Sequence, residues 1–163
     1  MNHLAISDNV FKLIDEDWML ITAGTIREWN TMTAGWGGLG VLWSRPVAFV
    51  FVRPTRYTYH FMEKARRFTL SFFDERYRKA LLFCGSKSGR DVDKAKATGL
   101  TPVSSSPGTV HFAQARMVMI CRKLYYQDLN PEAFLSPAIM RNYPQRDFHR
   151  MYVGEITRCL VRR

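Results

Sequence analysis

The chain has 163 residues, 47% hydrophobic and 23% charged, and its 24 Lys and Arg against 14 Asp and Glu give a formal net charge of +10. This composition is typical of one globular domain and excludes a fibrous protein, a coiled coil and a disulfide scaffold. It also excludes a membrane-spanning helix, because the longest apolar runs, Trp36–Trp43 and Val47–Val52, are far shorter than about 20 residues.

Residue periodicity and turn signals predict the following elements in chain order. The first half contains strands at Trp18–Thr25 and Glu28–Thr33 around a turn at Gly24, a buried strand at Pro46–Val52, a helix at Tyr57–Arg66 and a strand at Phe68–Phe73. The second half contains helices at Arg76–Cys84 and Val92–Ala97, a loop at Thr101–Thr109, a long strand at Val110–Tyr126 broken near Gln114, a weaker helical turn at Pro131–Arg141 and a strand at Phe148–Val161.

The order of these elements indicates a mainly β fold. Strands and helices do not alternate regularly, which disfavours a doubly wound parallel sheet and favours a barrel or open antiparallel sheet with helices at its ends. Several strands are apolar on both faces, for example at Met117–Cys121. Either helices or a second subunit must cover the outer face, so a homodimer is expected.

The N-terminal segment and the cysteines bear on location and metal binding. Met1–Asp17 has no basic region followed by an apolar stretch, so no signal peptide is predicted. Cys84, Cys121 and Cys159 are widely spaced and form no C-x-x-C pair. We therefore expect free thiols in a reducing cytoplasm and no metal site.

The positive charge is rich in arginine, with 17 Arg against 7 Lys. A basic surface can attract nucleic acid, an anionic membrane or an anionic small molecule, and arginine suits bidentate binding of phosphate. The charges form no block of five or six, so a scattered, solvated surface charge remains an equal alternative. The pair Arg162–Arg163 is expected to be a solvated tail.

One glycine-rich segment imitates a nucleotide-binding motif. Gly35–Gly40 matches G-x-G-x-x-G, but the dinucleotide turn needs a following helix and an acidic residue about 20 positions on. Val41–Pro46 is bulky and ends at proline, and no Asp or Glu lies between Glu28 and Glu63. We expect instead a loop in which the glycines pack closely beside two tryptophans.

Two segments at the ends of predicted strands have binding chemistry. Asn30–Trp36 offers short polar and small residues that can present backbone N–H groups to a planar ligand, although it is also compatible with an ordinary strand end. In Arg53–Thr58, two arginines, two hydroxyls and a helix N-terminus converge in a way that suits an anion. Thr55 or Thr58 is alternatively a helix cap.

Two later segments add to this set. In Ser86–Asp91, Lys87, Ser88 and Arg90 suit a phosphate or a polar ring edge, while Asp91 suits the N-cap of the next helix. His149–Ile156 places a histidine before a strand that contains a glycine, a feature that can mark close approach of the backbone to a ligand. A structural or exposed histidine is the alternative.

Together, and in this order, these segments resemble the flavin reductase-like family, whose members bind FMN in a split β-barrel, and more narrowly its flavoredoxin-like branch. The resemblance runs from about residue 18 to residue 156. It rests on Asn30–Trp36, Arg53–Tyr59, Gly85–Lys94 and His149–Ile156. It implies a mainly β Greek-key split barrel with peripheral helices, a homodimer with FMN near its interface, and one FMN-binding domain over residues 1–163.

The resemblance also implies roles for individual residues. The isoalloxazine ring would lie against Asn30, Thr31, Met32, Thr33, Ala34 and Trp36. The ribityl phosphate would lie among Arg53, Thr55, Arg56, Tyr57 and Thr58. Lys87, Ser88 and Arg90 would hold the phosphate or the ring edge. His149 matches a histidine near the nicotinamide side of the flavin in some relatives and is the candidate catalytic residue.

The implied activity is that of an NAD(P)H-dependent flavin reductase, in which hydride passes to flavin N5 and electrons go on to free flavin, oxygen, a monooxygenase or another redox protein. Lys87 and the amides around Thr33 and Ala34 would stabilise the charge that develops near flavin N1. The alternative within the family is a flavoredoxin-type FMN electron carrier with little NAD(P)H turnover. A nucleic-acid-binding module is disfavoured because no contiguous basic stripe is present. A split barrel that lacks flavin or binds haem also remains open.

Overall fold

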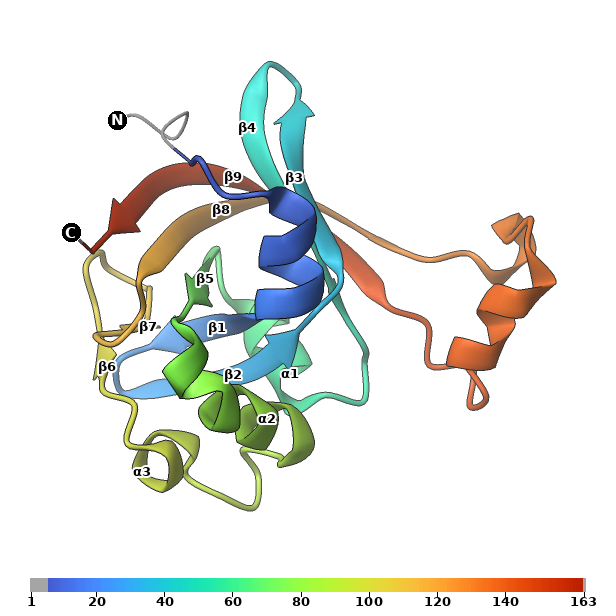
Figure 1. Ribbon diagram of the computed structural model, residues 1–163. Helices are drawn as coiled ribbons and strands as arrows, with labels where there is room; N and C mark the ends of the chain where they lie inside the picture. Colours follow the sequence, from blue (N-terminus) through green and yellow to red (C-terminus); the bar gives the residue numbers. More distant parts are fainter. Residues whose placement is uncertain (1–5, 163) are drawn as a thin grey trace.

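The computed structural model describes residues 6–162, in which a seven-stranded antiparallel sheet has the order β2-β1-β5-β8-β9-β4-β3 (Figure 1). Its strands are β1 Met19–Thr25, β2 Glu28–Ala34, β3 Gly37–Leu42, β4 Arg45–Val52, β5 Arg67–Phe72, β8 Met117–Asp128 and β9 Arg150–Val161. A short ribbon pairs β6 Pro102–Val103 with β7 His111–Phe112. The helices are α1 Tyr57–Lys64, α2 Arg78–Ser86 and α3 Lys94–Thr98, with a π-helical segment at Lys12–Asp17 and 3-10 turns at Glu75–Tyr77, Pro131–Ala133 and Pro137–Asn142.

The strands are apolar on both faces because each face packs against a separate core. Successive strand residues point to opposite sides, so Ile21 and Met119 join the core inside the curved sheet while their neighbours Leu20 and Ile120 join a second core outside it. Leu81 of α2 packs into that outer core. Helix α2 and the β6–β7 ribbon therefore cover the outer face that the sequence left open for a helix or a second subunit.

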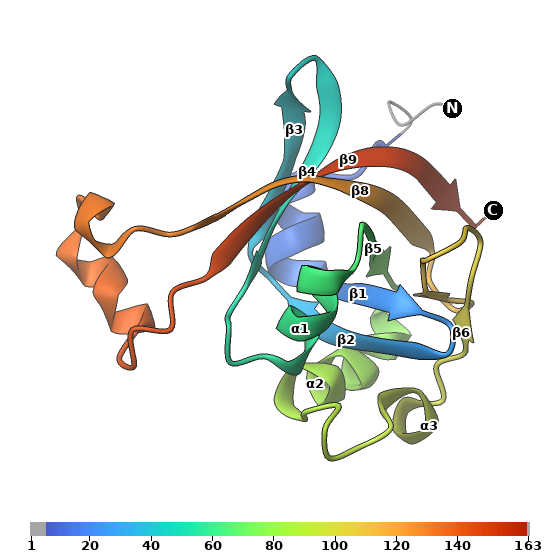
Figure 2. The ribbon, with the colours of Figure 1, turned by 180° about the vertical axis from the view of Figure 1, so that it is seen from behind.

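Strands β8 and β9 extend beyond the body and carry an arm, residues 129–149, that projects away from the sheet (Figures 1 and 2). Their pairing shifts register between Ile120 and Cys121 and again between Lys123 and Tyr125. Such irregularities bend and twist a strand pair, so the same two strands both close the sheet and lead out to the arm.

The structure confirms most of the predicted strands and helices and corrects several details. The predicted loop at Gly35–Gly40 is wrong over most of its length, because Gly37–Leu42 forms β3 and pairs with β4. A Cβ on Gly37 would lie 2.7 Å from the Phe49 carbonyl oxygen, so the glycine permits a close strand pairing. The hairpin turn is Trp43–Ser44, with φ values of 52° and 56°, a conformation that these residue types seldom signal.

Smaller corrections concern turns and caps. The β1–β2 turn lies at Ile26–Arg27 rather than at Gly24, which is still within β1. Asp93, not Asp91, caps α3 by accepting a hydrogen bond from the Lys96 amide.

The segment Thr101–Thr109 contains β6. Met1–Ala5 and Arg163 lie outside the described residues, but Arg162 is not a free tail because it donates to Asp74 over 2.8 Å. Within residues 6–162, none of the helices has the length and apolar content needed to cross a membrane.

Candidate functional site

Two neighbouring cavities lie between the strand ends, the start of α1 and the loop after α2, and both are lined by Arg56. The first, here called the polar cavity, has a volume of about 200 Å³ and is lined by Asn30, Thr55, Arg56, Tyr57, Thr58, Gly85, Ser86, Lys87, Ser88, Arg90 and Lys94. The second, the aromatic cavity, has a volume of about 210 Å³ and is lined by Met32, Thr33, Ala34, Gly35, Trp36, Phe51, Arg53, Arg56 and His149.

Segments far apart in sequence thus meet at one place. All the candidate site residues predicted from the sequence line one of the two cavities, with the exception of Thr31. The Thr31 side chain is buried in the sheet, where its hydroxyl lies 2.8 Å from that of Thr22 and 3.1 Å from the Ile21 carbonyl oxygen. Thr31 therefore supports β2 rather than lining the site.

The start of α1 faces the polar cavity. The N-cap residue of α1 is Arg56, and its side chain makes no capping hydrogen bond. The guanidinium has no acceptor atom, so it cannot satisfy the N–H groups of the first turn. Thr58 does not cap the helix either, because its buried hydroxyl accepts a hydrogen bond from Asn30 Nδ2 over 2.8 Å. This bond joins β2 to α1 and holds the uncapped helix end against the cavity lined by Tyr57 and Thr58.

Arg56 is a half-buried cation between the two cavities. Burial, and secondarily the charge of Arg53, lower its pKa. Among residues 6–162, no carboxylate lies within ion-pair distance of its guanidinium. A guanidinium stays charged in proteins, and a desolvated charge without a partner is costly. The site is therefore suited to an anion supplied from outside the chain.

Arg53 has a different environment from the one expected for a phosphate ligand. It lines the aromatic cavity, and its guanidinium contacts Asp147 at 3.0 Å and the Asn142 carbonyl oxygen at 2.8 Å. It also lies 4.9 Å from the centre of the Tyr143 ring. These contacts tie the arm to the end of β4, so Arg53 positions the arm in this structure.

The loop after α2 closes the polar cavity. The Arg90 guanidinium lies over the Tyr57 ring at 4.6 Å and contacts His60 Nε2 at 3.0 Å. Gly89 packs directly on Asn30, because a Cβ at this position would lie 1.9 Å from Asn30 Oδ1. Lys87 lines the cavity and is exposed.

Lys94 is a further candidate site residue, which was not predicted from the sequence. Its buried ammonium donates to the carbonyl oxygens of Thr31 at 2.7 Å and Cys84 at 2.8 Å, and it lines the polar cavity. Burial lowers its pKa to about 8. A lysine in a short, charged helix predicts a solvated side chain, and only its place at the end of the Gly85–Lys94 segment could have marked it.

His149 forms one wall of the aromatic cavity and is only 8% exposed. Its Nδ1 lies 2.6 Å from the Tyr143 hydroxyl, and its ring lies 5.4 Å from that of Trp36. Burial, and then the charge of Arg53, lower the pKa of His149 to about 4. The imidazole is therefore neutral near pH 7, and Tyr143 fixes its orientation.

Comparison with known proteins places the chain in a family. Residues 14–163 match the family model described as a flavin reductase like domain, so the chain belongs to that family. No curated protein sequence gives a significant match.

Solved structures with the same split-barrel fold include the FMN-binding protein from Thermus thermophilus (TM-score 0.70, 22% identity, 88% of this chain and 69% of that chain). They also include flavoredoxin of Desulfovibrio vulgaris (TM-score 0.70, 22% identity, 89% of this chain and 69% of that chain). A third is the Streptomyces globisporus NADH:FAD oxidoreductase (TM-score 0.66, 18% identity, 90% of this chain and 75% of that chain).

Proposed function

We propose that this protein binds FMN and acts as an NAD(P)H-dependent flavin reductase. The observation that carries the proposal is the half-buried Arg56 at the junction of the polar and the aromatic cavity, which has no ion-pair partner among the described residues. A flavin mononucleotide combines an anionic phosphate with a planar apolar ring, and the two cavities offer complementary surroundings for these parts. Membership of the flavin reductase-like family supports the same ligand.

The polar cavity would hold the phosphate. Arg56 supplies the charge, Thr55 adds a hydroxyl, and the uncapped amides at the start of α1 add donors and a favourable dipole. Lys87 and Lys94, which also line this cavity, contribute two further ammonium groups. The Asn30–Thr58 hydrogen bond keeps these elements at a constant separation.

The aromatic cavity would hold the ring. Met32, Thr33 and Ala34 line this cavity at the end of β2, and the rings of Trp36 and the neutral His149, 5.4 Å apart, also line it. The chemistry supplied by bound FMN is acceptance of hydride from a nicotinamide and onward transfer of electrons. The roles left to this chain are therefore to orient the ring, to exclude water and to place cations and amides near it.

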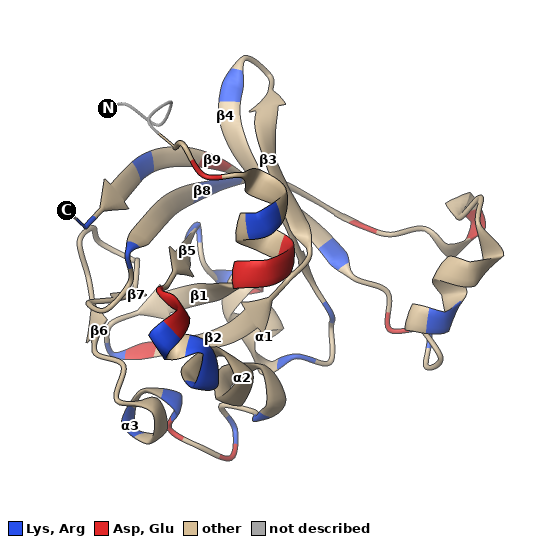
Figure 3. Ribbon diagram, in the orientation of Figure 1, with Lys and Arg blue, Asp and Glu red and all other residues tan. Residues whose placement is uncertain are grey.

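The proposal includes a homodimer in the cytoplasm. Large apolar side chains are exposed at the tip of the β3–β4 hairpin, at Val41 and Trp43, and on the arm, at Leu135 and Ile139. Exposed apolar groups on two projecting elements are typical of a protein–protein contact. The basic residues, in contrast, are spread over the helices, sheet and arm (Figure 3), which gives no support to a nucleic-acid interface.

A flavoredoxin-type electron carrier is the second candidate. It is favoured by the similarity in fold to flavoredoxin of Desulfovibrio vulgaris over 89% of this chain. The same cavities serve either role, because both need FMN bound and water excluded. The difference lies in whether a nicotinamide reduces the flavin at a useful rate.

The visible spectrum of the purified protein with FMN, before and after anaerobic addition of NADPH and then NADH, tests both candidates. A bound flavin that bleaches with a nicotinamide supports the reductase and identifies its donor. A bound flavin that bleaches only with dithionite favours the carrier. A protein that does not bind FMN contradicts both.

A further inference from the structure

One arm residue, Tyr143, contacts the proposed flavin site without lining it. Tyr143 follows the 3-10 turn Pro137–Asn142 and is only 4% exposed. Its hydroxyl lies 2.6 Å from Nδ1 of His149, which lines the aromatic cavity, whereas Tyr143 does not. Any effect of Tyr143 on a ligand in this cavity must therefore pass through His149.

The Tyr143 ring is held in place by contacts that do not involve its hydroxyl. The ring stacks on that of Phe134, with centres 6.0 Å apart and planes at 14°, and its centre lies 4.9 Å from that of Phe148. On the side of the cavity, the Arg53 guanidinium lies 4.9 Å from the ring centre. Because packing alone fixes the ring, the hydroxyl is directed at His149 even before a hydrogen bond forms.

Donor counting assigns the direction of this hydrogen bond. Within residues 6–162 the Tyr143 hydroxyl has no second partner, so if His149 donated, the hydroxyl proton would be buried without an acceptor, which is costly. Burial raises the pKa of Tyr143, so the phenol keeps its proton at neutral pH. The hydroxyl therefore donates to Nδ1, and the neutral imidazole of His149 carries its own proton on Nε2.

Nε2 of His149 makes no hydrogen bond within residues 6–162. It is nevertheless not sealed in the protein, because the fully buried polar side-chain atoms that lack a partner there are Ser71 Oγ, His111 Nδ1 and Asp147 Oδ1. His149 lines the aromatic cavity, with its ring centre 5.4 Å from that of Trp36. A planar ligand beside Trp36 would therefore meet one N–H donor with a fixed direction.

We propose that Tyr143 is a positioning residue of this site: its hydroxyl donates a hydrogen bond to His149 Nδ1 and thereby presents His149 Nε2–H to a carbonyl oxygen of the ligand in the aromatic cavity. The inference rests on the proposed function, because it names the ligand chemistry of that same site. Two planar groups bring such an oxygen, the ring of FMN and the carboxamide of the nicotinamide. Tyr143 contacts neither and acts only through the histidine.

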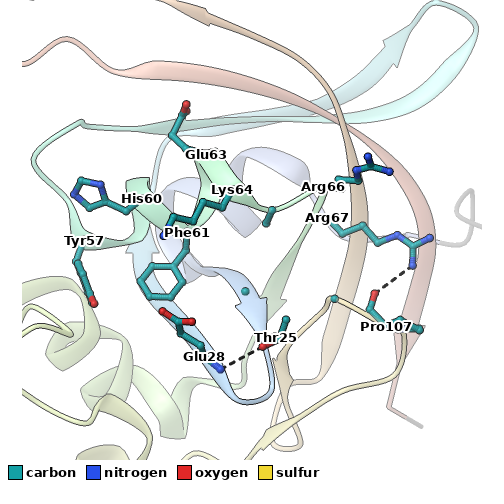
Figure 4. A pocket seen from close by; sticks show the side chains of 13 residues that line it. Thr25, Glu28, Tyr57, His60, Phe61, Glu63, Lys64, Arg66, Arg67 and Pro107 are labelled. Carbon is teal, nitrogen blue, oxygen red and sulfur yellow. Dashed lines mark hydrogen bonds between the residues drawn. The ribbon is translucent and has the colours of Figure 1, made fainter.

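His60 provides the opposite case in the same chain. It lines a groove of about 1060 Å³ along α1, where Figure 4 shows it near Tyr57. The Arg90 guanidinium has no acceptor atom, so at 3.0 Å from His60 Nε2 it must be the donor. The neutral His60 ring therefore carries its proton on Nδ1, and it serves as an internal reference for the tautomer of His149.

Nitrogen-15 NMR of the histidine rings reads the tautomer directly, because protonated and unprotonated ring nitrogens differ widely in chemical shift. The full chain is measured at pH 7 without FMN, and His149→Gln and His60→Gln assign the signals. The wild type is expected to carry the proton on Nε2 in His149 and on Nδ1 in His60. Tyr143→Phe keeps the ring and loses only the hydroxyl, so His149 should become a mixture of both tautomers while His60 stays unchanged.

Binding measurements identify the source of the carbonyl oxygen. FMN titrations and steady-state kinetics with NADH or NADPH compare Tyr143→Phe with the matched control Tyr125→Phe, whose hydroxyl donates to Gln127 over 2.8 Å and lines neither cavity of the site. Tyr143→Phe alone is expected to weaken one ligand roughly threefold to tenfold, the effect of one neutral hydrogen bond. Weaker FMN binding assigns the oxygen to the flavin ring, and a higher KM at unchanged FMN affinity assigns it to the nicotinamide.

Three results would overturn the inference. The first is a proton on Nδ1 of His149 in the wild type, and the second is an unchanged tautomer in Tyr143→Phe. The third is unchanged FMN affinity together with an unchanged KM or with no nicotinamide turnover. A protein that does not bind FMN contradicts the proposed function instead, and the NMR measurement, which needs no flavin, then still decides whether Tyr143 sets the tautomer of His149.

Discussion

Asn30 and Thr58 lie 28 positions apart in the sequence, and a buried 2.8 Å hydrogen bond from Asn30 Nδ2 to Thr58 Oγ1 joins β2 to the first turn of α1. The bond connects two elements that line the polar cavity. It therefore links the stability of the fold to the geometry of the proposed phosphate site.

Asn30→Ala is expected to destabilise the protein by about 1–3 kcal/mol, because it leaves the buried Thr58 hydroxyl without its donor. Urea unfolding of Asn30→Ala, Thr58→Val and the double variant measures the coupling between the two residues. A coupling of about 1 kcal/mol is expected. Strictly additive effects would show that the hydrogen bond does not contribute.

Gly89→Ala tests the same contact from the other side. An added Cβ would lie 1.9 Å from Asn30 Oδ1, so the Asn30 side chain must move and its bond to Thr58 must weaken. We expect a loss of about 1–3 kcal/mol in the free energy of unfolding and weaker FMN binding. Gly38→Ala is the control, because its Cβ would make only an ordinary contact of 3.7 Å with Phe49. Equal stability of the two variants would contradict the prediction.

Arg56→Ala is expected to separate binding from stability. Loss of the proposed phosphate contact should weaken FMN binding about 10-fold to 100-fold, while the rate of flavin reduction at saturating FMN changes little because Arg56 acts at the phosphate. The protein without FMN should be no less stable, since an unpaired half-buried cation is removed. Fluorescence titration and thermal unfolding measure the two effects. Unchanged FMN affinity would remove Arg56 from the site.

His149 is expected to make stability depend on pH. Its pKa of about 4 in the folded protein lies below the ordinary value of 6.5, so between these values the unfolded chain binds the extra proton. Stability should therefore fall as pH decreases from about 6.5 to 4, by roughly 2–3 kcal/mol. Urea unfolding at pH 7 and pH 4.5 should show a smaller difference for His149→Gln than for the wild type. The same variant should slow hydride transfer from the nicotinamide more than it weakens FMN binding, as measured by stopped-flow reduction.

Lys94 is expected to make FMN affinity depend on pH. Its ammonium has a pKa of about 8 and lines the proposed phosphate site. As pH rises from 7 to 9 the ammonium loses its proton, so the affinity for the anionic ligand should fall severalfold. Titrations at both values should show this decrease for the wild type and a flatter profile for Lys94→Met. The variant should also be less stable, because the Thr31 and Cys84 carbonyl oxygens lose their donor. An identical pH profile would show that Lys94 does not contact the phosphate.

The strands and the binding segments were predictable because local signals determine them. The β-branched run at Pro46–Val52 indicates a buried strand, and the hydroxyls and arginines after it mark a polar turn at a helix start. Strand β3 was not predicted, because its glycines are poor strand formers. They suit this strand only because the backbone of β3 pairs closely with β4 at Phe49.

The sequence by itself determined the family, the order of the strands along the chain and the residue types that gather at the site. Only the tertiary structure decided which of them are free to bind. Arg53 and Arg56 look equivalent in the sequence, yet Asp147 of the arm pairs with Arg53, whereas Arg56 has no ion-pair partner within residues 6–162. Lys94 is buried because β2 and α2 present two carbonyl oxygens to it. Burial and pairing are properties of residues brought together from distant segments, so no local pattern encodes them.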